Sequence, residues 1–272
     1  MMITTQSLHN HCTFDDGKDS PEAMAREAMA AGLRGFGLTA HSPMDGEPWT
    51  VAPERMEPFR AEMARLREAC APALQVWCGL EFDMTSDRTW LAGVDYVIAS
   101  VHALKTDRGL WALDDTRERS RRMIVLSFDG DADAAAEAYF RKVKEIALLP
   151  EADIVGHFDL ITKFDEPEPL YHADSPRYRA AAADAMETLV RAGKIFEINT
   201  GAVSRGYRTS FYPDNALLRL LREMGGRVTV TADAHSAANV TFGFEAAEQA
   251  ARAAGFTELW QFTGTGFEAV KL

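Results

Sequence analysis

The chain has 272 residues, of which 47% are hydrophobic and 26% are charged, and its formal net charge is −12. This composition is typical of a globular protein, and we expect a single domain over residues 1–272. The negative charge argues against nucleic acid or an anionic membrane as a partner, because both attract basic surfaces. The chain has no long apolar run and no signal-peptide pattern, so we expect a cytoplasmic protein.

Segments with strand and helix patterns alternate along the whole chain. Strands are expected near residues 4–9, 35–40, 75–82, 96–102, 154–158, 195–200 and 228–233, and a short last strand over 258–262. Helices are expected near residues 21–31, 53–70, 131–148, 175–192, 214–224 and 244–254. Ser20-Pro21 and Ser175-Pro176 are typical helix starts, and glycine follows several helices. Seven strands that alternate with helices predict a parallel sheet closed into a barrel.

Two segments, 103–130 and 159–174, are expected to be irregular. Each follows a strand that ends near a histidine, and loops at this end of barrel strands usually contact the substrate. The arginine-rich run 117–122 is expected to be a solvated surface.

Six of the seven histidines stand where a predicted strand ends. His9 and His11 are two residues apart, as are Asp233 and His235, so each pair projects to one side of its strand. The carboxyl ends of barrel strands open into one mouth, where these side chains would meet. The candidate metal ligands are His9, His11, Asp16, His41, Glu81, His102, His157, Asp233 and His235.

Nine nitrogen and oxygen donors are too many for one ion, because a tetrahedral zinc takes about four. They favour two or three ions that share a carboxylate. Mixed imidazole and carboxylate ligands suit Zn, Fe or Mn, and the three cysteines lack metal-binding spacing. Taken alone, a histidine of this kind is more often a hydrogen-bonded core or surface residue than a ligand, but their joint occurrence at strand ends favours a metal site. A protein that only binds metal is the non-enzymatic alternative.

The order H-x-H, Asp, His, Glu, His, His, D-x-H resembles the polymerase-and-histidinol-phosphatase (PHP) family of metal-dependent phosphoesterases. The surroundings of His102, the run 156–164 and the run 196–201 look like the histidinol-phosphate phosphatase branch of this family. The resemblance implies a distorted (β/α)7 barrel. It also implies hydrolysis of a small phosphate monoester by a metal-bound hydroxide, with L-histidinol phosphate as the best candidate and L-histidinol and phosphate as products.

The resemblance further implies a trinuclear site. His9, His11, Glu81 and Asp233 would hold one ion, and Glu81 would bridge to a second ion held by His102 and His157. Asp16, His41 and His235 would hold the third ion. We expect Glu81, Asp233 and Arg205 to act in catalysis, with Arg205 and Lys163 on the substrate's phosphate and Arg208 as a weaker candidate there.

The chain departs from the family at four positions near these motifs. Ser7 and Ala40 stand where the family usually has acidic residues, and Cys12 and Asp15 replace a threonine and a serine. None of these changes removes a ligand. Other PHP enzymes remain as alternatives: a phosphoesterase for a nucleotide or sugar phosphate, and an exonuclease, which the negative charge disfavours.

Overall fold

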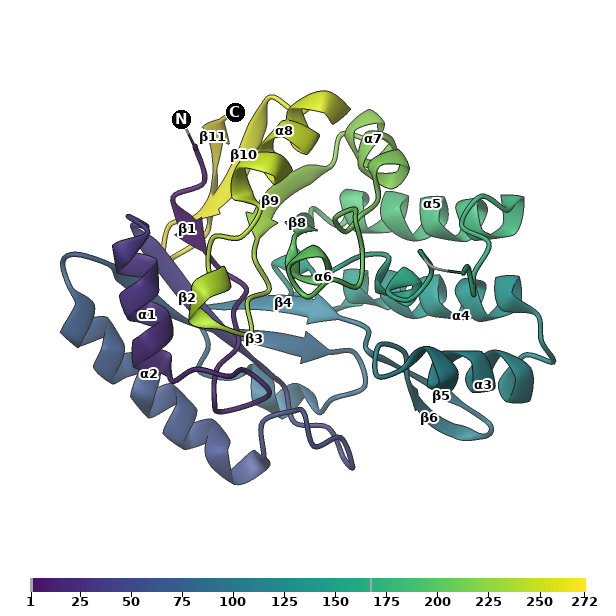
Figure 1. The fold of residues 1–272 in the computed structure, drawn as a ribbon, viewed down its shortest axis with the longest axis horizontal. Helices are drawn as coiled ribbons and strands as arrows, with labels where there is room; N and C mark the ends of the chain where they lie inside the picture. Colours follow the sequence, from purple (N-terminus) through teal and green to yellow (C-terminus); the bar gives the residue numbers. More distant parts are fainter. Residues whose placement is uncertain (1, 167) are drawn as a thin grey trace.

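The computed structural model describes residues 2–166 and 168–272 of the chain. Its centre is a parallel sheet of seven strands in the order β1-β2-β3-β4-β7-β8-β9 (Figure 1). These strands are β1 (Gln6–Ser7), β2 (Gly35–His41), β3 (Gln75–Asp83), β4 (Tyr96–Ser100), β7 (Ile154–Val155), β8 (Ile195–Asn199) and β9 (Arg227–Thr231). The seven predicted barrel strands are confirmed.

The first and last strands of the sheet meet just beyond their carboxyl ends. A parallel bridge joins Asn10 to Ala234. The backbone N–H of His11 donates to the carbonyl of Ala234 at 2.8 Å, and the N–H of Ala234 donates to the carbonyl of His9 at 3.2 Å. The sheet therefore almost closes into a barrel, as predicted, and it closes where the H-x-H and D-x-H motifs lie.

Helices cover the outside of the barrel (Figure 1). They are α1 (Pro21–Ala30), α2 (Met56–Cys70), α4 (Ala132–Lys144), α5 (Pro176–Arg191), α7 (Asn215–Glu223) and α8 (Phe244–Ala254). The Ser20 and Ser175 hydroxyls accept hydrogen bonds from the N–H groups of Ala23 and Tyr178, so both predicted caps form. Short 3₁₀ turns, η1 (Pro53–Arg55) and η3 (Glu145–Leu148), occupy the ends of two of the predicted helical segments. None of the described helices is both long enough and apolar enough to cross a bilayer.

The expectation of irregular structure over 103–130 was wrong. This segment forms a hairpin of β5 (Ala103–Thr106) and β6 (Gly109–Ala112), followed by α3 (Arg117–Ser127). The arginine-rich run is the start of α3, where the Thr116 hydroxyl caps the helix by accepting from the N–H of Arg119. This helix was not predicted from the local sequence because its charged residues outnumber its buried ones. Within the described part of 159–174, the regular element is the 3₁₀ turn η4 (Leu160–Thr162), and α6 (Gly201–Ser204) follows β8.

Aromatic side chains fill the amino-terminal end of the barrel. The Tyr96 ring lies against Gly37 and Gly79, where an added Cβ would overlap it, and its hydroxyl donates to the carbonyl of Leu8. Phe262 packs against Tyr96 with ring centroids 5.2 Å apart. Phe262 ends β10 (Glu258–Phe262), the predicted last strand, which pairs with β11 (Phe267–Lys271) instead of joining the barrel. This apolar plug leaves the opposite end of the barrel for polar side chains.

Candidate metal centre

All nine predicted ligands lie at the carboxyl end of the barrel. His9 and His11 follow β1, His41 ends β2, and Asp16 comes from the loop after His11. Glu81 lies in β3, His102 follows β4, His157 follows β7, and Asp233 and His235 follow β9. Seven of the nine side chains are buried. His235 is half-buried and Asp16 is exposed at the rim.

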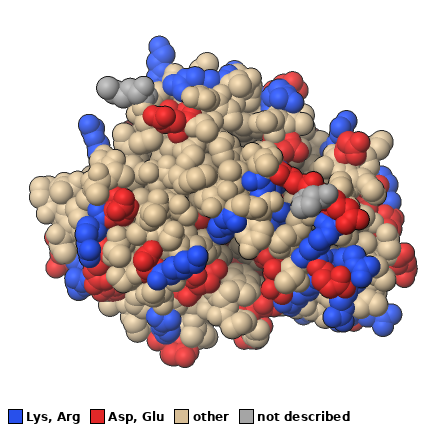
Figure 2. Space-filling view, in the orientation of Figure 1, with Lys and Arg blue, Asp and Glu red and all other residues tan. Residues whose placement is uncertain are grey.

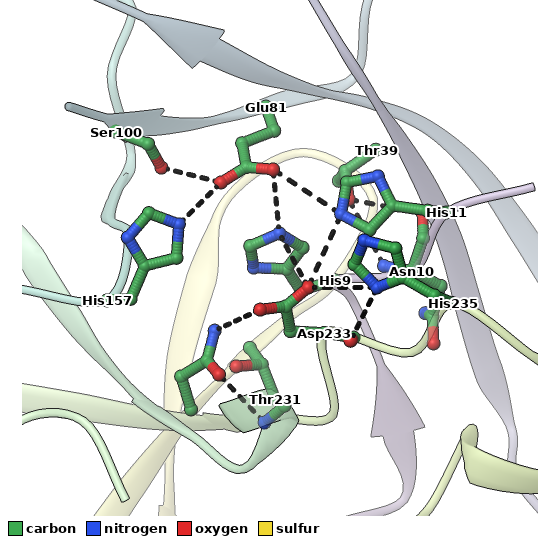
Figure 3. Close-up of polar contacts among 12 residues, drawn as sticks. His9, Asn10, His11, Thr39, Glu81, Ser100, His157, Thr231, Asp233 and His235 are labelled. Carbon is green, nitrogen blue, oxygen red and sulfur yellow. Dashed lines mark hydrogen bonds and ion pairs between the residues drawn. The ribbon is translucent and has the colours of Figure 1, made fainter. Parts of the chain in front are cut away.

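The Glu81 carboxylate lies between His157 on one side and His9 and His11 on the other (Figure 3). Its Oε2 atom is 3.1 Å from Nε2 of His9 and 2.9 Å from Nδ1 of His41. Its Oε1 atom is 3.2 Å from Nε2 of His102 and 2.8 Å from Nε2 of His157. Each oxygen thus faces a different set of ring nitrogens, which is the arrangement a bridging carboxylate requires.

The three predicted ligand sets each come together. In the first, Nε2 of His11 is 3.4 Å from Glu81 and 3.5 Å from Asp233. In the second, the Nε2 atoms of His102 and His157 face each other at 3.1 Å. In the third, Asp16 lies 3.2 Å from Nε2 of His235 and 3.6 Å from Nε2 of His41. His41 belongs to both the first and third sets geometrically, because its Nδ1 points to Glu81 and its Nε2 to Asp16.

The donor set fits divalent ions. Four buried atoms face the centre, namely His9 Nε2, His11 Nε2, His41 Nδ1 and Glu81 Oε2. The three nitrogens lie 2.9–3.4 Å from the Glu81 oxygen, but none of the four atoms makes a well-aligned hydrogen bond with any described residue. A buried polar atom left without a partner costs about 1–3 kcal/mol, and a cation would satisfy these atoms together. Ligands on a tetrahedral ion with bonds of about 2.1 Å are about 3.4 Å apart, close to the separations found here. Imidazole and carboxylate ligands suit Zn, Fe or Mn.

A second group of carboxylates orients the imidazoles from behind. Nδ1 of His9 donates to Glu197 at 2.8 Å, and Nδ1 of His11 donates to Asp15 at 2.8 Å. Nδ1 of His102 lies 3.3 Å from Asp83. Such partners fix the tautomer and direct the other ring nitrogen to the metal. Sequence reasoning gave Asp15 no such role, and it missed Glu197 and Asp83.

Two of these partners had a signal in the sequence. Asp83 is two residues after Glu81, and Glu197 is two residues before Asn199, so each shares a strand face with another polar residue. Asp15, one of the departures from the family pattern, also accepts from the backbone N–H of His41 at 3.0 Å. Carboxylates are therefore supplied to the imidazoles even though residues 7 and 40 are Ser and Ala.

The charges of the buried groups support one another. Burial alone would lower the pKa of His9, but the carboxylates of Glu197, Glu81 and Asp233 outweigh it and raise this pKa to about 10. Burial alone would raise the pKa of Glu81, but the surrounding histidines hold it well below its usual range. Without metal, His9 therefore carries a proton, and this positive charge lies among the same carboxylates that would attract a metal ion.

Asp233 adopts a backbone conformation that is uncommon for a residue with a side chain. Its φ is +47°, in the left-handed region, where aspartate is several-fold enriched among non-glycine residues. A Cβ on Gly201 would lie 2.7 Å from the Asp233 side chain, so this approach requires glycine. Arg205 follows α6 and donates from Nη2 to the Asp233 carboxylate at 3.1 Å and from Nη1 to its carbonyl at 3.2 Å.

A cavity of about 240 Å³ opens beside these groups. Two of the predicted substrate-binding residues, Arg205 and Lys163, line it. Nζ of Lys163 donates to the carbonyl of Asp114 at 2.8 Å, which fixes the ammonium group at the wall. Seven of the candidate ligands also line the cavity. Sequence reasoning did not name the remaining five lining residues, which are Trp49, Asp114, Asp115, Leu160 and Tyr207.

Arg208, the weaker candidate for binding the substrate's phosphate, does not line this cavity. A residue that contacts the substrate would be expected to line it. Its side chain is buried, donates to the Thr162 hydroxyl, and lies 3.5 Å from the Asp159 carboxylate. The guanidinium also stacks on the Tyr212 ring, 4.5 Å from its centroid. Arg208 thus anchors the turn that carries Lys163 to the body of the protein.

Comparison with known proteins finds a PHP domain and relatives named as histidinol phosphatases. The PHP domain matches residues 7–201. A Deinococcus radiodurans protein named "Probable histidinol-phosphatase" is 28% identical over 248 residues, which cover 87% of this chain and 88% of that protein. A solved Listeria monocytogenes structure covers 89% of this chain and 99% of its own, with a TM-score of 0.79 and 18% identity. The Lactococcus lactis histidinol phosphate phosphatase, solved with zinc, L-histidinol and phosphate, covers 97% of this chain and 99% of its own, with a TM-score of 0.70 and 21% identity.

Proposed function

Because the chain belongs to the PHP family, we propose that it is a metal-dependent phosphatase that hydrolyses L-histidinol phosphate to L-histidinol and phosphate. The observation that carries this proposal is the position of Glu81, whose two oxygens face two different sets of imidazoles. A carboxylate shared in this way serves neighbouring cations, and neighbouring cations are suited to phosphate esters.

We assign three ions to the site. His9, His11, Glu81 and Asp233 would hold one, and Glu81, His102 and His157 a second. Asp16, His41 and His235 would hold the third. When bound, such ions lower the pKa of water and neutralise charge on the phosphate oxygens. The protein's own contribution is to orient the imidazoles through Glu197, Asp15 and Asp83.

Arg205 and Lys163 are the proposed phosphate-binding residues of the chain itself. Both line the cavity next to the ligand sets. A guanidinium presents a planar pair of donors to phosphate, whereas an ammonium acts as a point charge. Lys163 is already fixed by its bond to the Asp114 carbonyl, so little ordering would be needed when substrate enters.

The cavity favours a small ester. Its volume of about 240 Å³ lies below the range of about 300–1,000 Å³ that holds drug-sized ligands. A compact amino-alcohol phosphate suits this size better than a nucleotide. The curated relative named above and the Lactococcus lactis structure with L-histidinol and phosphate support the same choice.

The proposal is tested by assaying the protein, loaded separately with Zn, Mn and Fe, against phosphate monoesters that include L-histidinol phosphate, a nucleotide and a sugar phosphate. We expect the highest kcat/KM with L-histidinol phosphate, and metal analysis should give more than one transition ion per chain. Absence of metal together with absence of activity after metal addition would disprove the metal centre. A higher kcat/KM for another ester would retain the phosphatase and replace its substrate.

A further inference from the structure

The side chain of Trp49 forms an apolar wall of the cavity beside the ligand sets. Its ring centroid is 4.7 Å from that of His41, with the planes at 90°, and 5.3 Å from that of His102. A phosphate held at the metal centre would leave the rest of the ester to extend along the cavity wall. Trp49 is therefore placed to contact the leaving group and not the phosphate.

A chain of polar contacts fixes this indole. Its Nε1 donates to Oε2 of Glu47 at 2.9 Å, and Oε1 of Glu47 accepts from Arg119 at 3.2 Å. The other terminal nitrogen of Arg119 donates to Asp115, also at 3.2 Å. Arg119 belongs to α3, so the contacts tie the loop after β2 to the helix that was absent from the predicted elements. Trp49 and Asp115, the first and last residues in this series of contacts, both line the cavity.

The loop that carries Trp49 is itself held close to the metal centre. The N–H of Val51 donates to the carbonyl of His41 at 3.1 Å, and the Thr50 hydroxyl donates to the carbonyl of Glu47 at 2.9 Å. The indole thus has a fixed position before substrate binds. Tyr207, another aromatic ring of the cavity lining, is 43% exposed and lies under Nζ of Lys163 at 4.7 Å. Tyr207 is thus at the rim, whereas Trp49 is the ring of the cavity lining that contacts His41 and His102.

We propose that Trp49 determines specificity by packing against a planar leaving group of the phosphate monoester, with Glu47 and Arg119 as positioning residues. This inference rests on the proposed phosphatase function. Planar rings gain from edge or offset contact with an aromatic side chain beyond the area they bury. The imidazole of L-histidinol is such a ring, whereas glycerol offers none. The contact is present before and during reaction, so it lowers KM and leaves kcat nearly unchanged.

The test compares Trp49→Leu and Trp49→Phe with the parent enzyme on L-histidinol phosphate, phenyl phosphate and glycerol 2-phosphate. Trp49→Leu should raise KM for the two planar esters about 10-fold, equivalent to about 1.4 kcal/mol. It should change KM for glycerol 2-phosphate less than about 2-fold, within the usual effect of a surface substitution. Trp49→Phe, which keeps an aromatic ring but loses the bond to Glu47, should show a preference between those of the parent and Trp49→Leu. Metal content and inhibition by inorganic phosphate should remain at the parent's level.

Variants of the contact chain and of the same loop provide controls. Glu47→Ala should weaken the preference for planar esters in the same direction as Trp49→Leu, while Asp45→Ala, at an exposed position of the loop, should not. Equal rises in KM for all three esters, or loss of metal, would overturn the proposal and make Trp49 a support for His41 and His102. If the parent prefers another ester to L-histidinol phosphate, the proposed substrate fails. A selective loss on phenyl phosphate would then still uphold the role of Trp49.

Discussion

Glu197 accepts a hydrogen bond from Nδ1 of His9 at 2.8 Å, and neither side chain is exposed to solvent. Its other oxygen accepts from the backbone N–H of His157 at 2.6 Å. A single buried carboxylate therefore fixes candidate ligands from two different strands. β8 has no candidate ligand among its residues, yet it holds the ligands of other strands in position.

Replacing Glu197 should weaken the metal centre without removing a ligand. Glu197→Gln presents an amide N–H₂ to at least one of the donors that now bind the carboxylate, so His9 or His157 loses its fixed orientation. We expect metal affinity or kcat/KM to fall about 10- to 100-fold. Titration with a metal chelator measures the affinity. Thr231→Val removes one bond to Glu197, of 2.8 Å, and should cost clearly less.

Glu81 should be the most sensitive of the candidate ligands. Glu81→Gln keeps the side-chain volume but removes the charge that two ions would share. We expect kcat to fall by at least about 10³, as when a key electrostatic group is removed. The His102→Gln variant, which affects one ion, is the comparison. Near-normal turnover of Glu81→Gln at full metal content would contradict the bridging role.

Arg205 should act on substrate more than on metal retention. Arg205→Ala removes a charge-assisted pair with phosphate of about 1.5–3 kcal/mol, so kcat/KM should fall about 10- to 100-fold. Its bond to Asp233 makes the metal content of the variant the informative second measurement. Retained metal supports phosphate binding, whereas loss of metal parallel to activity would mean that Arg205 serves Asp233.

Arg208 should matter for stability. Arg208→Ala leaves the buried Asp159 carboxylate, 3.5 Å away, without its cationic neighbour. Breaking a buried pair from one side costs about 3–5 kcal/mol of unfolding free energy. Denaturant unfolding of the metal-loaded protein measures this loss. An unchanged midpoint with a raised KM would instead support the original expectation of a substrate contact.

The pH dependence of stability should differ from that of metal binding. In the metal-free protein the pKa of His9 is raised to about 10, above the ordinary value of about 6.5. The stability gained from this proton is complete below about pH 6.5 and is lost as pH rises through about 10. Metal must displace the proton, so metal affinity rises over the same interval. Between about pH 6.5 and about pH 8, we expect the chelated protein to lose stability while the affinity for zinc increases.

The Glu197→Gln variant is the control for this prediction. Glu197 is the strongest cause that raises the pKa of His9, so both pH dependences should flatten without its charge. Thermal unfolding of chelated samples and zinc titration at matched pH values provide the two measurements. A rise of both quantities with pH would show that His9 is neutral in the metal-free protein.

Local sequence was enough to predict the barrel and to choose the nine candidate ligands. Strand and helix periodicity are properties of the local sequence. They fix where a residue lies along its own strand, and this place does not depend on the neighbouring elements. Once seven parallel strands are assigned, His9, Glu81 and Asp233 must open into one mouth. Spacing and topology therefore gave the nine candidates, and the resemblance to the PHP family gave their division into three ligand sets.

The tertiary structure decided how the side chains around these ligands pair. Arg205 and Arg208 are three residues apart in one loop, yet one lines the cavity and the other lies in the core. Glu197 reaches His9 across 188 residues, and Arg119 reaches Glu47 across 72. Such contacts depend on the closed barrel and on α3, a helix that was not predicted because its sequence is rich in charged residues. Periodicity places a residue on its own element, whereas a polar partner from a distant element is set only when the chain has packed.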